Sequence, residues 1–175
     1  MGVSPFISKD LNHHTATGTG ATWGIQGRTF DCISHIITVP HHSIFNFGTG
    51  DFTIEIWAQS LDDEIEMTGK VTSGTDFWML GRSGTKAIFY LYNTNLADTI
   101  TGTTDIGSSL HHIVMARASG TLRMFVDGVD NGSVASVKSM DFTGNQKIGS
   151  GYTGFNRGII GEVRLYNRAL SAHEV

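Results

Sequence analysis

Residues 110–128 read LHHIVMARASGTLRMFVDG, and this stretch decides the fold that the chain is expected to adopt. Two runs rich in apolar residues, 110–117 and 121–127, are separated by three small residues. In the second run Leu122, Met124 and Val126 share one face at the two-residue period of a β-strand. The dipeptide Asp127-Gly128 can supply the positive φ angles of a tight turn. The stretch therefore predicts β-hairpins.

The same pattern recurs along the rest of the chain. Residues 52–59 alternate cleanly, with Phe52, Ile54, Ile56 and Ala58 on one face. The other predicted strands are 28–33, 35–39, 76–80, 86–92, 146–149 and 158–166. Helix signals are few: a short turn at 41–47, and the Ser-x-x-Glu spacing of a capping box at 171–174. Short strands separated by turn residues predict an all-β sandwich or jelly roll of two antiparallel sheets.

Composition limits the class of protein further. The 175 residues include 22 glycines and 2 prolines, which suits many tight turns, and nothing resembling a linker divides the chain. We therefore expect a single domain over residues 1–175. A formal net charge of −4 offers no basic field for nucleic acid, and no apolar run approaches the roughly 18 residues of a membrane span. The start, MGVSPFISKD, shows no signal peptide, and a lone Cys32 allows no internal disulfide.

Four stretches in order resemble a known family: 17–40 (TGTGATWGIQGRTFDCISHIITVP), 45–60 (FNFGTGDFTIEIWAQS), 110–128, and 158–175 (GIIGEVRLYNRALSAHEV). Together they resemble a laminin-G-like jelly roll of the concanavalin A-like lectin and glucanase superfamily. The resemblance implies that the strands at 110–117 and 121–127 lie in the middle of one sheet. Members of the superfamily include sugar-binding modules, adhesion domains, some glycosidases and lyases, and virion proteins, so the fold alone does not define a function.

Aromatic residues are the candidates for sugar binding, because sugars stack their C–H surfaces on aromatic rings. The resemblance implies that Trp78, Tyr90, Tyr92 and Asn93 fall in central strands near the concave sheet. Tyr90 and Tyr92 share a strand face by their spacing. The alternative for each aromatic residue is a place in the core. Two further tryptophans, Trp23 and Trp57, match positions that are structural in the family, and we expect them in the core.

Calcium is the cofactor that the resemblance implies, held between the N-terminal loop and the last strand. Asp10 and Asn12 match the family's early ligands, and carboxylate and amide oxygens are what Ca²⁺ prefers. At the other end this chain has Gly161 where relatives often carry Asp, and Asp10 can equally serve as a turn or cap residue. The histidines occur as adjacent pairs, which point to opposite faces of a strand and cannot jointly grip a metal there. A histidine site would need His13 or His41 in loops, and one of His111 and His112 is expected to be a hydrogen-bonded interior group.

Catalytic patterns are weak. The Glu-x-Asp-x-x-Glu pattern of glycosidases in the superfamily is absent, and its closest counterpart is Asp62, Glu64 and Glu66, which would share a face if extended. We interpret these three as a solvated acidic loop, with a cation site as the alternative. Cys32 is expected to be a small core residue rather than a nucleophile. Arg164, Tyr166, Asn167 and Arg168 are expected on an outward face that packs against the N-terminal segment.

The sequence thus predicts a non-catalytic binding module that recognises a glycan or polysaccharide, or serves adhesion, on an extracellular or virion surface. The alternative is a structural or decoration protein whose jelly roll makes protein–protein contacts in a virion or surface assembly. A glycan-cleaving enzyme is the third and least favoured class.

Overall fold

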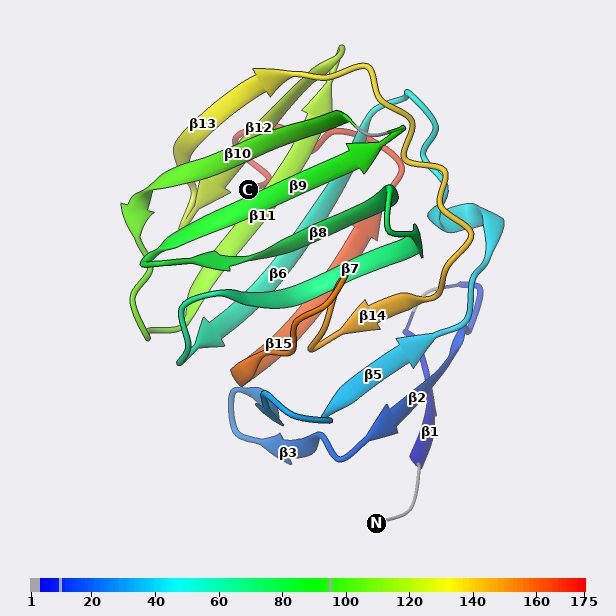
Figure 1. Ribbon diagram of the computed structural model, residues 1–175, viewed down its shortest axis with the longest axis vertical. Helices are drawn as coiled ribbons and strands as arrows, with labels where there is room; N and C mark the ends of the chain where they lie inside the picture. Colours follow the sequence, from blue (N-terminus) through cyan, green and yellow to red (C-terminus); the bar gives the residue numbers. More distant parts are fainter. Residues whose placement is uncertain (1–3, 10, 95) are drawn as a thin grey trace.

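Two antiparallel β-sheets packed face to face make up the computed structural model, which describes residues 4–9, 11–94 and 96–175 (Figure 1). In the described chain the first, sheet A, has eight strands in the spatial order β1 (Ser4–Ile7), β2 (Thr15–Thr19), β5 (Ile36–Val39), β14 (Gln146–Ile148), β7 (Ile65–Ser73), β8 (Asp76–Ser83), β9 (Lys86–Asn93) and β10 (Leu96–Asp105). The second, sheet B, has seven: β13 (Val129–Ala135), β12 (Thr121–Val126), β11 (His111–Ala118), β6 (Phe52–Ser60), β15 (Arg157–Tyr166), β4 (Gly27–Asp31) and β3 (Thr22–Gly24). The predicted all-β sandwich is confirmed.

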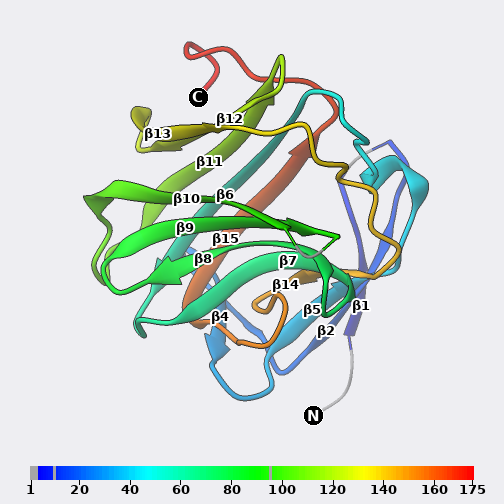
Figure 2. The ribbon, with the colours of Figure 1, turned by 45° about the horizontal axis from the view of Figure 1, so that its top comes forward.

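The two layers are seen obliquely in Figure 2, where sheet A lies over sheet B with the strands of the two sheets inclined to each other. The core between them forms where each strand turns its apolar residues inward. In β6 the inward residues are Phe52, Ile54, Ile56 and Ala58, all buried as the alternation predicts. Within the described ranges the one helical element is the 3-10 turn η1 (Ser43–Phe45), and no helix has the length and apolarity needed to cross a membrane.

The hairpin predicted from residues 110–128 is present. Strand β11 pairs with β12 and also with β6, so it lies inside sheet B, and β12 pairs onward with β13. The β12–β13 turn has φ of 50° at Asp127 and 77° at Gly128. Two successive positive φ angles are typical of the type I′ turn, whose twist matches that of the flanking strands.

Replacing Gly128 with valine tests this turn. An ideal Cβ at Gly128 meets no atom within 4 Å, so the penalty comes from backbone conformation alone. A β-branched residue in the left-handed region costs about 1–2 kcal/mol, and we expect Gly128→Val to lower the melting temperature by several degrees. Gly128→Asn is the control, since asparagine tolerates this conformation and should melt close to the wild type. A melting temperature unchanged by valine would contradict the turn.

Six strands occupy segments for which no strand was predicted: β1, β2, β3, β7, β10 and β13. The clearest case is β7, whose inward side carries the polar residues Thr68 and Lys70 and which contains Gly69. Such residues break the apolar alternation by which a strand is recognised, so the segment from Asp62 to Gly74 was interpreted as a loop. The interpretation is wrong from Ile65 onward.

Trp23 and Trp57 were expected in the core, and the structure corrects this. Trp23 is 74% exposed on the short edge strand β3, where its ring packs against the Arg28 guanidinium at 4.2 Å. Trp57 is 42% exposed. It alternates with Ile56 and Ala58, which occupy the inward positions of β6, so its ring lies on the outer face of sheet B.

Candidate functional site

Tyr90 and Tyr92 lie together on the outer face of sheet A, the face turned away from sheet B. Strand β9 sends Ala87, Phe89 and Leu91 into the core, all fully buried, and leaves both tyrosines half-buried on the other side. The predicted common face of the two tyrosines is therefore present.

Trp78 and Asn93 do not join them. Trp78 is 1% exposed and packs in the core, with its ring centroid 6.2 Å from that of Phe89. No ligand on the outer face can reach it, so its prediction as a sugar platform is corrected. Asn93 follows Tyr92, so its side chain points to the opposite face of the sheet. Its Nδ2 donates to the carbonyl oxygen of Ser139 at 3.3 Å. The reason in both cases is the two-residue period of the strand.

Two further aromatic rings stack beside Tyr92 (residues 77 and 152). Phe77 on β8 stands opposite Tyr92 in register, with ring centroids 5.3 Å apart and planes at 15°. Tyr152, from the loop that follows β14, stacks on Phe77 at 4.4 Å and 3°. Since this loop approaches from the β7 side and Tyr92 from the β9 side, Phe77 lies between them. We refer to Tyr152, Phe77 and Tyr92 as the aromatic pile.

The pile keeps free aromatic surface at its ends. Both wide faces of Phe77 are covered, whereas Tyr92 borders β10, which places only the small exposed residues Ala97 and Thr99 opposite Tyr92 and Tyr90. Tyr152 is 39% exposed. A flat apolar ligand can therefore lie along the tyrosines on the β10 side without displacing a large neighbour.

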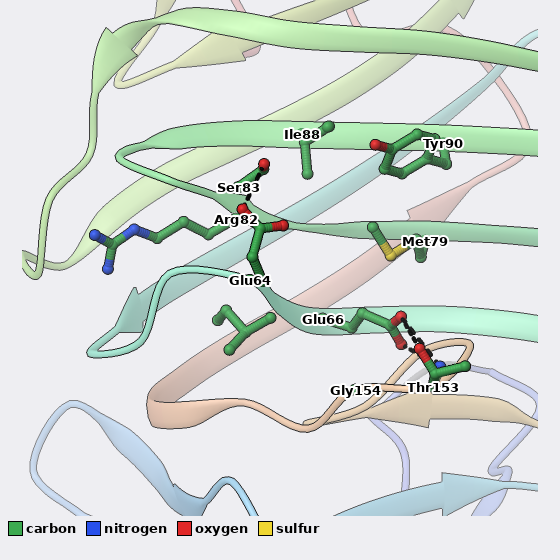
Figure 3. A pocket seen from close by; sticks show the side chains of 10 residues that line it. Glu64, Glu66, Met79, Arg82, Ser83, Ile88, Tyr90, Thr153 and Gly154 are labelled. Atoms are coloured by element: carbon green, nitrogen blue, oxygen red, sulfur yellow. Dashed lines mark hydrogen bonds between the residues drawn. The ribbon is translucent and has the colours of Figure 1, made fainter.

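A hollow of about 180 Å³ adjoins Tyr90 and is shown in Figure 3. Its walls include Glu64 from the loop before β7, Glu66 from β7, Met79 from β8, and Ile88 from β9. Gly81 stands in register between Glu66 and Ile88, which both line the hollow, and it adds no side chain between them. An ideal Cβ at Gly81 would lie 2.1 Å from the carbonyl oxygen of Ile65, so no larger residue fits there.

Both carboxylates of the hollow are oriented by hydrogen bonds, drawn in part in Figure 3. The backbone N–H of Thr153 donates to both oxygens of Glu66, at 3.1 and 3.0 Å. Ser83 Oγ donates to Glu64 at 2.8 Å, and the N–H of Gly84 donates to the same oxygen at 3.1 Å. Glu66 is 8% exposed and lies on a strand, so the interpretation as a solvated acidic loop fails for it. Asp62 lies apart, paired with Arg157 at 2.6 Å.

The proposed calcium ligands are not brought together in the described residues. Asp10 lies outside the described residues, and Asn12 is exposed in a turn. Elsewhere in residues 4–9, 11–94 and 96–175, no group of three or more His, Cys, Asp or Glu side chains could hold a metal ion. At Gly161, where relatives often carry Asp, an ideal Cβ would lie 3.0 Å from the carbonyl oxygen of Gln26 and 3.3 Å from Trp57 Cβ. The chain is thus closely packed around Gly161, at the position where relatives often have a carboxylate ligand.

A second polar cluster lies on the outer face of sheet B. Buried Glu55 accepts hydrogen bonds from the Tyr166 hydroxyl at 3.0 Å and, more weakly, from Arg164 at 3.4 Å, and its Oε1 lies 2.9 Å from His112 Nε2. Burial and the bond to Glu55 raise the pKa of Tyr166. His112 is thus the hydrogen-bonded interior group that was predicted. Arg164 and Tyr166 bond to β6 rather than to the N-terminal segment, which corrects their expected environment.

The cysteine is not activated as a nucleophile. Cys32 is half-buried at the end of β4 and packs against the core, and its Sγ lies 3.3 Å from the carbonyl oxygen of Phe155 as a donor. Burial and a hydrogen bond with Asp62 raise the pKa of its thiol, which disfavours the reactive thiolate.

Comparison with known proteins agrees with the architecture. The profile of a family described as the concanavalin A-like lectin/glucanases superfamily, Laminin_G_3, matches residues 34–175. Among curated protein sequences, no match was found.

Three solved structures illustrate the likeness in fold. The binding domain of Paraclostridial mosquitocidal protein 1 superposes with a TM-score of 0.73 at 13% identity, over 98% of this chain and 50% of that one. The botulinum neurotoxin serotype D binding domain gives 0.74 at 9% identity, over 96% and 47%. Domain 4 of AbnA, an extracellular arabinanase from Geobacillus stearothermophilus in complex with arabinotriose, gives 0.63 at 13% identity, over 99% and 79%. This chain thus spans about half the length of the two toxin binding domains.

Proposed function

Because this chain belongs to the concanavalin A-like lectin/glucanase superfamily, we propose that it is a non-catalytic carbohydrate-binding module that acts outside a cell. The proposed site is the outer face of sheet A, where Tyr90 and the aromatic pile adjoin the hollow. The observation that carries the proposal is the pair of half-buried tyrosines beside the small residues of β10. Aromatic rings supply apolar surface for the C–H face of a sugar, while hydroxyl and carboxylate groups next to them take hydrogen bonds from sugar hydroxyls.

The comparisons support both the extracellular setting and a carbohydrate ligand, and the proposal does not rest on them alone. AbnA domain 4 belongs to an extracellular arabinanase and was solved with arabinotriose, and the two domains superpose over most of both chains. The proposed mode of binding requires stacking and hydrogen bonds, and it uses no metal ion.

The same geometry favours binding over cleavage. Hydrolysis with retention or inversion needs two carboxyl groups on opposite sides of the scissile bond, one of them free to donate a proton. Here the Thr153 N–H donates to both oxygens of Glu66, and the Ser83 hydroxyl and the Gly84 N–H donate to one oxygen of Glu64. Both carboxylates are thus engaged by the protein's own donors rather than free to act on a glycosidic oxygen.

An array of neutral, acidic and amino oligosaccharides, with arabinotriose included, tests the function. We expect binding to at least one class at neutral pH, with no release of reducing ends on prolonged incubation. Silence across the array would remove the carbohydrate proposal, and release of reducing ends would remove its non-catalytic part.

The location of the site is tested by substitution. Tyr90→Ala and Tyr92→Ala should each weaken binding to the best array ligand roughly tenfold, the equivalent of about 1.4 kcal/mol, in isothermal titration calorimetry. Trp57→Ala is the matched control, because Trp57 is an exposed aromatic residue on the outer face of the other sheet. Equal losses in all three variants, or a loss in Trp57→Ala alone, would place the site elsewhere.

A further inference from the structure

The hollow beside Tyr90 contains two carboxylates for which the described residues supply no ion-pair partner. Glu66 is 8% exposed, and within the described chain neither Glu64 nor Glu66 forms an ion pair. Their hydrogen-bond donors are the neutral groups of Ser83, Gly84 and Thr153. A carboxylate removed from water is costly unless a countercharge compensates it. The hollow is therefore short of one positive charge.

Three cationic side chains around the hollow are engaged by other groups. Arg82 lines the hollow with its stem, but Figure 3 shows the guanidinium directed away, and it donates to the carbonyl oxygen of Ser60 at 2.9 Å and to Asp63 at 2.9 Å. Lys147 donates to the carbonyl oxygen of Gly151 at 3.2 Å, and Lys86 pairs with Asp105 at 2.7 Å. None of the three can serve an anionic ligand without leaving these partners.

The size and the walls of the hollow suit a single sugar ring. Its volume of about 180 Å³ is about six times the share of one water molecule in the liquid. Met79, Ile88 and the edge of Tyr90 offer an apolar side, and the two carboxylates offer acceptors only. An ammonium group, which has three donors and no acceptor, matches such a set better than a hydroxyl does.

We propose that the Glu64–Glu66 hollow selects a sugar that carries a free amino group, and that it rejects acidic sugars. This inference rests on the proposed function and names the ligand class of the same site. The ammonium group of the sugar pairs with these carboxylates and supplies the missing positive charge, while the ring stands against Tyr90.

Three oligosaccharides of equal length separate the charge of the ligand from its shape. The β1,4-linked glucosamine tetramer and cellotetraose differ only in an ammonium or a hydroxyl group at C2, and tetragalacturonic acid carries carboxylates. At about pH 6 we expect calorimetry to show glucosamine tetramer binding at least tenfold more tightly than cellotetraose, with no binding of the acid. Raising the pH to about 8.5, where the sugar amine loses its proton, should remove the preference.

Glu66→Gln provides the matched protein variant, because it keeps the shape and an acceptor for the Thr153 N–H while removing the charge. It should weaken glucosamine tetramer binding roughly tenfold and change cellotetraose binding far less, because the amide oxygen still accepts a hydrogen bond from a sugar hydroxyl. Glu162→Gln is the control, since Glu162 pairs with Arg164 on sheet B. Thermal melting shows whether Glu66→Gln is folded. The preference of the wild-type protein for the amine is measured without any variant, so it tests the proposal even if Glu66→Gln does not fold.

The outcomes separate the two proposals. If cellotetraose or tetragalacturonic acid binds as well as the amine and binding depends on Tyr90, the amine preference is wrong while the carbohydrate site stands. If no sugar of any class binds, both proposals fail together.

Discussion

Arg117→Ala is expected to lower the free energy of unfolding by about 3–5 kcal/mol, the range for removing one partner of a buried charged network. Arg117 is fully buried, and its guanidinium donates to three backbone carbonyl oxygens: Gly50 at 2.8 Å, Lys138 at 2.5 Å and Gly48 at 2.6 Å. These carbonyls belong to two connecting segments, so one side chain holds both against β11. Burial also lowers the pKa of Arg117.

The physical reason for the size of the effect is that alanine removes the guanidinium donor from three carbonyl groups and opens a cavity at once; of the three, the Gly48 oxygen still accepts from the Met140 N–H at 2.8 Å. A buried polar group that loses its partner costs more than an ordinary hydrogen bond contributes. The guanidinium of Arg117 also lies over the Phe52 ring, with its Cζ 4.9 Å from the ring centroid.

Arg123→Ala is the control for Arg117→Ala. Arg123 lies on the neighbouring strand β12, is partly exposed, and pairs with Asp130 across the sheet surface. An exposed ion pair contributes about 0–1 kcal/mol, so chemical denaturation should show a small change. If Arg117→Ala also lost less than about 1 kcal/mol, the three carbonyls would be satisfied by water, and the role assigned to the guanidinium would be wrong.

Stability should rise with pH above about pH 8 because of Lys70. This side chain is fully buried between the sheets, its Nζ donates to Asn46 Oδ1 at 2.9 Å, and among the described residues no carboxylate forms an ion pair with it. Burial lowers the pKa of Lys70 to about 8. In the unfolded chain its pKa is about 10.4.

The sign follows from proton counting. Below pH 8 Lys70 is protonated in both states, and the folded protein bears the cost of a buried charge. Between the two pKa values the folded state has released the proton and the unfolded state retains it, so the free energy of unfolding increases with pH. Each pH unit adds about 1.4 kcal/mol, which predicts a gain of about 2 kcal/mol between pH 8 and about pH 9.5.

Lys70→Met isolates this contribution, since methionine has a similar length and no charge. Urea denaturation of both proteins at several pH values should give a flat difference below pH 8, followed by a rise in the wild type that the variant lacks. Parallel curves for the two proteins across this range would show that Lys70 keeps its proton in the fold. The Asn46 amide is half-buried, so water can replace the lost donor.

Much of the fold could be predicted from local pattern. The alternation in β6 and β12, the positive φ at Asp127 and Gly128, and the common face of Tyr90 and Tyr92 follow from the geometry of a single strand or turn. These features need no knowledge of what lies opposite. The segments that broke the pattern, β7 above all, have polar residues inside the sandwich whose partners are distant in sequence, as Lys70 and Asn46 show.

The residues of the candidate site were harder to predict, because their positions depend on packing between distant parts of the chain. In the run Phe77-Trp78 both residues are aromatic, so the local sequence does not say which of them faces the core, and the larger ring was chosen wrongly for the surface. Trp78 packs beside Phe89 in the core, and Phe77 is left outside to join the pile. Tyr152 and Thr153 come from a loop remote in sequence from Phe77 and Glu66, and no motif links them.

What the sequence by itself determined about this protein is therefore its class: a two-layer β-sandwich with short strands, tight turns and two tyrosines on one face, because strand period and turn conformation are properties of neighbouring residues. The tertiary structure alone decided which aromatic ring lies inside, which glutamate is buried, and where a hollow opens beside Tyr90. Those outcomes depend on filling one core between two sheets, and the volume of that core is set by all the strands together.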